Sequence, residues 1–212
     1  MAIDTLIPAR SALLFFDMLN GHIKKDDPKT QARYKPVIAA ASQLLQGARA
    51  HRVMVAYACA NHRADNATSA HTVCDTDGRL KPIPIDQKPN FVPIVAGGTW
   101  EASVIDELAP APEDYVSPKY RWSAFFQTYL DLALRTRKID TLIIAGGSTD
   151  VGVASTAYTA RDLDYNLVIV NDACSSPEHD NHDQFMRRIF PRMARVRTAA
   201  QVVEMLQAGV GK

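Results

Sequence analysis

Short, nearly continuous runs of apolar residues recur along the chain and alternate with longer amphipathic stretches. The runs do not carry a polar residue at every second position, which is typical of strands buried on both faces of a parallel sheet. Strands are therefore predicted at residues 11–17, 52–58, 114–117, 141–145, 166–171 and 195–198, the last of them a short edge strand.

The amphipathic stretches carry apolar residues at helical spacing. Val37, Ala41 and Leu44, for example, fall on one face of a helix. Helices are predicted at residues 34–49, 124–135, 151–163, 184–194 and 199–206. Strands that alternate with helices in this way predict an α/β fold of three layers, a parallel sheet with helices on both faces.

Residues 61–98 interrupt this alternation, because they are rich in proline and glycine and show little periodicity. A loop of that length inside a compact domain is typical of a lid or a binding surface. The chain contains no repeat, low-complexity tract or linker that would divide it. Residues 1–212 are therefore predicted to form a single domain.

Charge and composition exclude several classes of protein. Twenty-four Lys and Arg residues against 23 Asp and Glu residues leave a net charge of +1, which argues against nucleic-acid or anionic-membrane partners. No apolar run is long enough for a membrane span, and the N-terminus does not resemble a signal peptide. The 3 cysteines form no disulfide framework and no CxxC pair. A cytoplasmic protein with reduced thiols is expected.

Candidate chemistry follows three of the predicted strands. Ligands of an open parallel sheet bind beyond the carboxyl ends of its strands, where the sequence places Asp17, Lys119 and residues 146–152. The last segment, Gly-Gly-Ser-Thr-Asp-Val-Gly, predicts a strand-to-helix turn whose N–H groups favour an anion. Alone, such an Asp more often caps a loop and such a Lys is more often solvated. Together they indicate an acid–base pair.

Five segments, in this order and spacing, carry a resemblance to a known family. They are residues 16–20 (Phe-Asp-Met-Leu-Asn), 98–100 (Gly-Thr-Trp), 119–125 (Lys-Tyr-Arg-Trp-Ser-Ala-Phe), 146–152 and 171–174 (Asn-Asp-Ala-Cys). On these motifs, which span most of the chain, the sequence resembles the isochorismatase-like hydrolases, or cysteine hydrolase superfamily. The resemblance implies a Rossmann-like sheet of six parallel strands in the order 3-2-1-4-5-6. It also implies a small-molecule substrate, no cofactor, and a homo-oligomer, either a dimer or a tetramer.

The family's catalytic Asp, Lys and Cys can be placed residue by residue. The resemblance assigns the Asp to Asp17 and the Lys to Lys119. It implies a non-proline cis peptide bond near Gly147 and Ser148, and an oxyanion hole formed by the backbone N–H groups of Ser148 and Gly152. The nucleophilic Cys falls at Gly152, which has no side chain, so the thioester route is closed at that position.

Two features of the sequence favour different reactions. Isochorismatases proper share the 119–125 motif and also have Gly at the position of Gly152. They hydrolyse a vinyl ether by protonation of an alkene carbon and capture of water, and their Gly is expected to leave room for the substrate. Asn61, His62 and Arg63 instead resemble the amide-cleaving branch. C–O hydrolysis, water-based C–N hydrolysis and a catalytically silent metabolite-binding relative all stay open.

The remaining candidates are substrate contacts rather than metal ligands. Trp100 and Tyr120 join Asn61, His62 and Arg63 as predicted substrate-binding residues. Zinc-binding relatives use an Asp-x-His pair, and Ala60 stands where that Asp would precede His62. No metal is therefore expected, and His62 and His71 are interpreted as loop residues or substrate contacts. Cys59, at a strand end, is the alternative nucleophile.

Overall fold

One parallel sheet forms the centre of the protein. The computed structural model describes residues 4–70 and 95–211, and its 6 strands lie in the order β3-β2-β1-β4-β5-β6. The strands are β1 (Ser11–Phe16), β2 (Met54–Ala60), β3 (Tyr115–Lys119), β4 (Thr141–Gly147), β5 (Asn166–Ser175) and β6 (Arg195–Arg197). All neighbouring strands are parallel, so the predicted fold class and strand order are confirmed. The order reverses between β1 and β4, which is where such sheets bind ligands.

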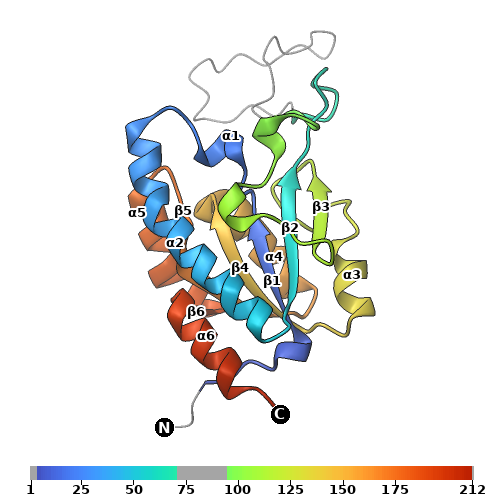
Figure 1. Ribbon diagram of the computed structural model, residues 1–212, viewed down its shortest axis with the longest axis vertical. Coiled ribbons are helices and arrows are strands. Elements are labelled where there is room, and N and C mark those ends of the chain that lie inside the picture. Colours follow the sequence, from blue (N-terminus) through green and yellow to red (C-terminus); the bar gives the residue numbers. More distant parts are fainter. Residues whose placement is uncertain (1–3, 71–94, 212) are drawn as a thin grey trace.

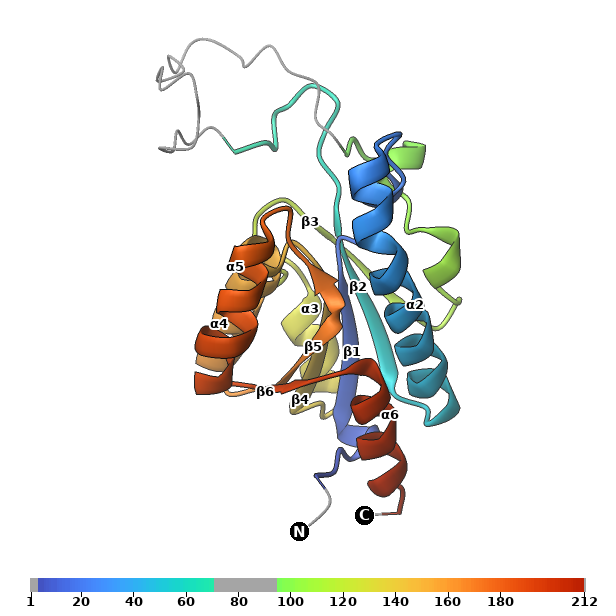
Figure 2. The ribbon, with the colours of Figure 1, turned by 90° about the vertical axis from the view of Figure 1, so that its left-hand side faces the viewer.

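Helices cover both faces of the sheet, as predicted. They are α1 (Asn20–Ile23), α2 (Pro28–Ala50), α3 (Leu130–Thr136), α4 (Ala154–Asp162), α5 (His179–Gln184) and α6 (Ala199–Ala208). Figures 1 and 2 show α2 and α6 on one face and α3, α4 and α5 on the other. Alternate side chains of β1 serve the two faces: Leu13 and Phe15 join the core under α2 and α6, whereas Leu14 and Phe16 join the core under α4.

The helix α2 begins at Pro28, before the predicted start at residue 34. The carboxylate of Asp27 accepts the Thr30 N–H at 2.9 Å and the Thr30 hydroxyl at 2.6 Å. Proline suits the first helical position, where its missing N–H has no partner to lose. The helix also continues through Pro36. Its additional N-terminal turns carry Arg33 and Tyr34 to the edge of the sheet where Asp17 lies.

Other helix and strand boundaries differ from the predicted ones for local reasons. In the helix predicted at 124–135, only Leu130–Thr136 is helical, because the Thr128 hydroxyl donates to the Ala124 carbonyl at 2.6 Å within a preceding turn. The segment predicted as one α-helix at 184–194 instead contains a π-helix, Phe185–Ile189, followed by a 3₁₀-helix, Phe190–Arg192. Strand β5 continues to Ser175, because its pairing with β4 resumes after a shift in register.

The loop predicted to act as a lid lies only in part within the described residues. Residues 71–94, and His71 with them, lie outside. Of the rest, residues 61–70 form turns, and His62 pairs with Ala96 in an isolated bridge. In the described part of the chain, no helix is both long enough and apolar enough to cross a membrane.

Candidate active site

Asp17 follows β1 in an unusual backbone conformation. Its φ of 49° lies in the left-handed region, which few residues other than glycine adopt. Its N–H donates to the Ala58 carbonyl at 2.9 Å, and its Oδ1 accepts the Ala60 N–H at 2.7 Å. Both contacts tie Asp17 to the end of β2. The carboxylate is therefore held in one position by the backbone of the neighbouring strand.

Lys119, the last residue of β3, meets the other oxygen of this carboxylate. Its Nζ lies 2.6 Å from Oδ2 of Asp17, and the two side chains are only 6% and 11% exposed. A charge-assisted hydrogen bond of this kind is stronger than one between neutral groups. A buried ion pair is nevertheless poor at stabilising a fold, because both charges lose their hydration. Such a pair in a cavity can take up and return a proton in a sheltered place.

The aromatic ring of Phe16 lies between Lys119 and Gly152. The Lys119 Nζ stands 4.3 Å from the ring centroid, a distance at which the ring face attracts the ammonium. A Cβ added to Gly152 would overlap Cε1 and Cζ of this ring and lie 2.9 Å from Cδ1. Gly152 was expected to leave room for the substrate, but the space that a side chain at this position would enter is already filled. That space belongs to Phe16, which is 2% exposed.

The turn after β4 is anchored by side chains from more distant parts of the chain. The Gly147–Ser148 peptide bond is cis, as the resemblance implied. Asp150 accepts hydrogen bonds from the Ser148 hydroxyl, from Ser176 at 2.7 Å and from Asn181 at 2.7 Å. Burial raises the pKa of Asp150, but these hydrogen bonds outweigh it and hold the pKa below its usual value. A short π-helix, Thr149–Val153, then leads into α4.

A cavity of about 350 Å³ joins these groups. Five of the predicted site residues line it together: Asp17, Lys119, Gly147, Ser148 and Gly152. The Asp17–Lys119 pair, the backbone around Ser148 and Gly152, and the Phe16 ring thus meet at the carboxyl ends of β1, β3 and β4. Trp122, whose sequence position allowed either a place in the pocket or packing in the core or an interface, also lines the cavity. So do residues that the sequence analysis did not identify, among them His22, Lys25, Arg33, Tyr34 and Ser176.

These additional residues come mainly from α1 and the first turns of α2. Burial lowers the pKa of His22, with Lys119 and Lys25 contributing in the same direction and the Asp17 carboxylate opposing them. Tyr34 is 7% exposed, and a Cβ added to Gly147 would lie 2.9 Å from its hydroxyl oxygen. The predicted helix 34–49 already included Tyr34, and the Asp27-Pro28 pair, a helix-start signal, could have extended it to Arg33.

The five predicted substrate-binding residues do not line this cavity. Asn61 and Trp100 line a separate one of about 590 Å³. The His62 ring contacts the Tyr120 ring edge-on, with centroids 6.2 Å apart. Arg63 is exposed and forms an ion pair with Asp65 at 2.9 Å. The loop that carries Asn61, His62 and Arg63 continues beyond the end of β2, so these side chains reach other surroundings.

Cys59 also lines the separate cavity and not the one that Asp17 lines. It is 6% exposed, and burial, helped by the nearby Asp17 carboxylate, raises its pKa to about 12. A thiol with such a pKa is almost entirely protonated at neutral pH and is a poor nucleophile. The position of Cys59 therefore disfavours it as the alternative nucleophile.

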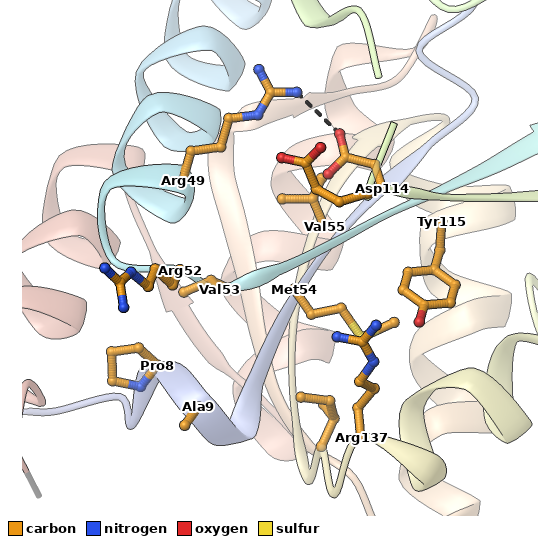
Figure 3. A pocket seen from close by; sticks show the side chains of 12 residues that line it. Pro8, Ala9, Arg49, Arg52, Val53, Met54, Val55, Asp114, Tyr115 and Arg137 are labelled. Atoms are coloured by element: carbon orange, nitrogen blue, oxygen red, sulfur yellow. Dashed lines mark hydrogen bonds and ion pairs between the residues drawn. The ribbon is translucent and has the colours of Figure 1, made fainter. Parts of the chain in front are cut away.

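A further cavity, of about 530 Å³, lies at the opposite edge of the sheet (Figure 3). Its walls include the residues before β1 and β4 and the first residues of β2 and β3. Arg49 pairs there with Asp114 at 3.0 Å, and the Arg137 guanidinium lies 5.4 Å from the Tyr115 ring centroid. It is separated from Asp17 by the length of β1, so it takes no part in the candidate site.

Within residues 4–70 and 95–211, no group of three or more His, Cys, Asp or Glu side chains is placed to hold a metal ion. The two histidines of α5 have other surroundings. Thr149 Oγ1 lies 2.9 Å from His182 Nδ1, and Asn171 Oδ1 lies 3.2 Å from His182 Nε2. His182 therefore links the turn after β4 to β5.

Comparison with known proteins identifies the family of the chain. The family model for the Isochorismatase domain matches residues 11–201. The chain belongs to the isochorismatase family, whose members are hydrolases.

Among individual relatives, the uncharacterized isochorismatase family protein YwoC of Bacillus subtilis is 30% identical, over 93% of this chain and 95% of its own. YecD of Escherichia coli, also an uncharacterized family member, is 37% identical, but over only 58% of this chain and 64% of its own length. The ureidoacrylate amidohydrolase RutB of Rhizobium rhizogenes is 31% identical, over 80% of this chain and 72% of its own.

Two solved structures share the fold. An isochorismatase family protein from Burkholderia thailandensis superposes with a TM-score of 0.79 at 30% identity, covering 97% of this chain and 100% of the other. The N-carbamoylsarcosine amidase of Thermoplasma acidophilum superposes with a TM-score of 0.67 at 26% identity, covering 90% and 96%. Amide-cleaving enzymes are thus among the relatives.

Proposed function

We propose that this hydrolase acts on a small metabolite through Asp17, Lys119 and a water molecule, without a covalent intermediate at position 152. Asp17 is the general acid–base group, and Lys119 is its electrostatic partner. The N–H groups of Ser148 and Gly152 bind negative charge as it develops. The observation that carries the proposal is the buried 2.6 Å contact between Lys119 and Asp17 in the cavity that Gly152 lines.

Water is the proposed nucleophile because neither candidate position for a covalent nucleophile, Gly152 or Cys59, can supply one. Gly152 has no side chain, and Phe16 occupies the space where one would begin. Cys59 lines another cavity and has a raised pKa. A general base that activates water needs no such side chain.

With the Asp17 carboxylate as the proton acceptor, C–N hydrolysis is one candidate reaction. Asp17 takes a proton from water, the resulting hydroxide adds to the carbonyl carbon, and the N–H groups hold the oxyanion. Asp17 then returns the proton to the leaving nitrogen, and the C–N bond breaks. Two relatives, RutB and the N-carbamoylsarcosine amidase, carry names of amide-cleaving enzymes.

The absence of a side chain at Gly152 favours C–O hydrolysis of a vinyl ether as the other candidate. Asp17 must first be protonated. It then gives its proton to the alkene carbon, and water adds to the oxocarbenium carbon and returns a proton to Asp17. The hemiketal breaks to a ketone and an alcohol.

A substrate panel tests the proposal and separates the two reactions. Turnover of isochorismate, maleamate and a set of ureido acids would be measured for the wild-type protein and for Asp17→Asn. We expect one class to be turned over and Asp17→Asn to lose nearly all of that activity. Circular dichroism would check that the variant is folded. Full activity in a folded Asp17→Asn variant would contradict the role of Asp17.

The remaining expectations are proposals as well. The 212 residues are proposed to form one domain that works without a metal, in the cytoplasm, as a homo-oligomer. Large apolar side chains exposed on the surface support the oligomer, among them Trp122 at 67%, Leu132 at 66% and Tyr158 at 50%. Light scattering after size exclusion measures the assembly directly, and activity after dialysis against a chelator tests for a metal.

A further inference from the structure

Arg33 lines the Asp17 cavity with part of its guanidinium buried and without a hydrogen-bond partner. It lines the cavity from the second turn of α2, and its side chain is half-buried. Its Nε is buried without a hydrogen-bond partner, and no ion pair to its guanidinium is found within residues 4–70 and 95–211. Buried polar groups of this kind are rare, and each one in a native structure calls for an explanation.

The guanidinium is nevertheless held in place. Its Cζ lies 5.1 Å from the centroid of the Tyr34 ring, within the range of a cation–π contact. Tyr34 is buried, and its hydroxyl stands next to Gly147 of the cis peptide bond. Arg33 is therefore positioned against the same turn that carries Ser148 and Gly152.

The acids of the cavity are already engaged or exposed. Asp17 is paired with Lys119, and Asp150 accepts hydrogen bonds from three neutral donors. Glu178 also lines the cavity but is exposed. Lys25 and Arg33 form no ion pair with these acids in the described part of the chain. Although the three acids and three cations of the lining balance formally, Lys25 and Arg33 are the two cations left for a ligand to pair with.

We propose that Arg33, assisted by Lys25, binds a free carboxylate group of the substrate, so that the substrates are small carboxylated metabolites. A carboxylate can accept two parallel hydrogen bonds from a guanidinium. It would supply the hydrogen-bond acceptor that the Nε of Arg33 lacks and would fix the reacting bond near Asp17. Arg33 is then a specificity-determining residue, while the chemistry stays with Asp17 and Lys119. This assignment rests on the proposed function for the position of the reacting bond, but the binding itself does not.

The test is therefore a binding measurement that needs no turnover. Calorimetry would follow maleate, succinate and benzoate binding to the wild-type protein, Arg33→Met, Arg33→Lys and Lys25→Met. Arg137→Met, in the cavity of Figure 3, is the matched control. We expect Arg33→Met to weaken binding of the preferred carboxylate by about tenfold or more, with partial recovery in Arg33→Lys, a smaller loss in Lys25→Met and no change in the control.

The matched amides extend the test. Maleamide, which lacks a carboxylate, should bind equally weakly to the wild-type protein and to Arg33→Met. If a substrate is found, Arg33→Met should raise KM far more than it lowers kcat, the reverse of Asp17→Asn.

Two results would overturn the proposal: equal carboxylate affinity in the wild-type protein and in a folded Arg33→Met variant, or no carboxylate binding by the wild-type protein. Carboxylate binding that depends on Arg33, without turnover of any substrate, would instead contradict the proposed function and leave this inference standing.

Discussion

The ring of Phe16 occupies the space in which a side chain at Gly152 would begin. A Cβ built there overlaps two ring carbons and lies 2.9 Å from a third, well inside van der Waals contact. Phe16 is buried under α4 and lies beneath the Lys119 ammonium, so a shift of the ring would also change its contact with Lys119. The two residues therefore form one unit.

Restoring a cysteine is expected to fail for this reason. Gly152→Cys alone should destabilise the fold by about 1–3 kcal/mol, the usual effect of overpacking a core, and should gain no thiol-dependent activity. Phe16→Val should also destabilise the fold, by leaving a cavity. The double variant should lose less stability than the sum of the two single losses, because the two residues share the same space. Urea unfolding of all four proteins measures the coupling, and additive losses would contradict the shared space.

Breaking the buried ion pair should affect stability as well as activity. Lys119→Met leaves the Asp17 carboxylate buried without its partner, and the expected loss is about 3–5 kcal/mol. Asp17→Asn combined with Lys119→Met removes both charges and should recover much of that loss while remaining inactive. Arg135→Met, which breaks an exposed pair with Asp131, is the control and should lose less than about 1 kcal/mol. If Lys119→Met and Arg135→Met lost similar amounts of stability, the result would contradict the burial of the Asp17–Lys119 pair.

Asp150 is predicted to act on the site through the turn that it anchors. Asp150→Ala leaves the hydroxyls of Ser148 and Ser176 and the amide of Asn181 without their acceptor. A loss of stability of about 1–3 kcal/mol is expected, together with a lower kcat and little change in KM. Asp150→Asn keeps one acceptor oxygen and should recover part of both. Unchanged kcat in Asp150→Ala would separate this turn from catalysis.

Acidification should destabilise the protein at two histidines. Burial lowers the pKa of both His22 and His182 below 6.5, so the unfolded chain binds protons more readily than the folded one. Their contribution to stability is complete above pH 6.5 and is lost as the pH falls from there toward the lowered pKa values. The free energy of unfolding, measured by urea titration between pH 7.5 and 5, should therefore decrease. The His22→Gln variant should show a shallower decrease, and an identical slope would rule out His22 as a contributor.

Much of the fold follows from local patterns in the sequence. Continuous apolar runs distinguish buried parallel strands from half-exposed ones, so the strands were predicted close to their observed positions. Because carboxyl ends of parallel strands share one edge, Asp17, Lys119 and the 146–152 turn could be expected to meet, and all three line one cavity. The family resemblance added the strand order, which no local pattern contains.

The contents of the cavity beyond these residues depended on tertiary structure. Asn61 and Arg63 follow the end of β2, and Trp100 lies between β2 and β3. Asn61 and Trp100 nevertheless line a separate cavity, and Arg63 pairs with Asp65 on the surface. Arg33 and Tyr34 are distant in sequence from every strand end, and α2 brings them over the turn at Gly147.

The sequence by itself determined which strands form and which charged groups end them, because hydrophobic periodicity acts over a few neighbouring residues. It also determined that no side chain stands at Gly152. Only the tertiary structure decided that the ring of Phe16 occupies that space and that the guanidinium of Arg33, with its buried Nε lacking a hydrogen bond, lines the same cavity. Those outcomes depend on side-chain packing between elements far apart in the chain, and packing is set by the whole fold rather than by any local pattern.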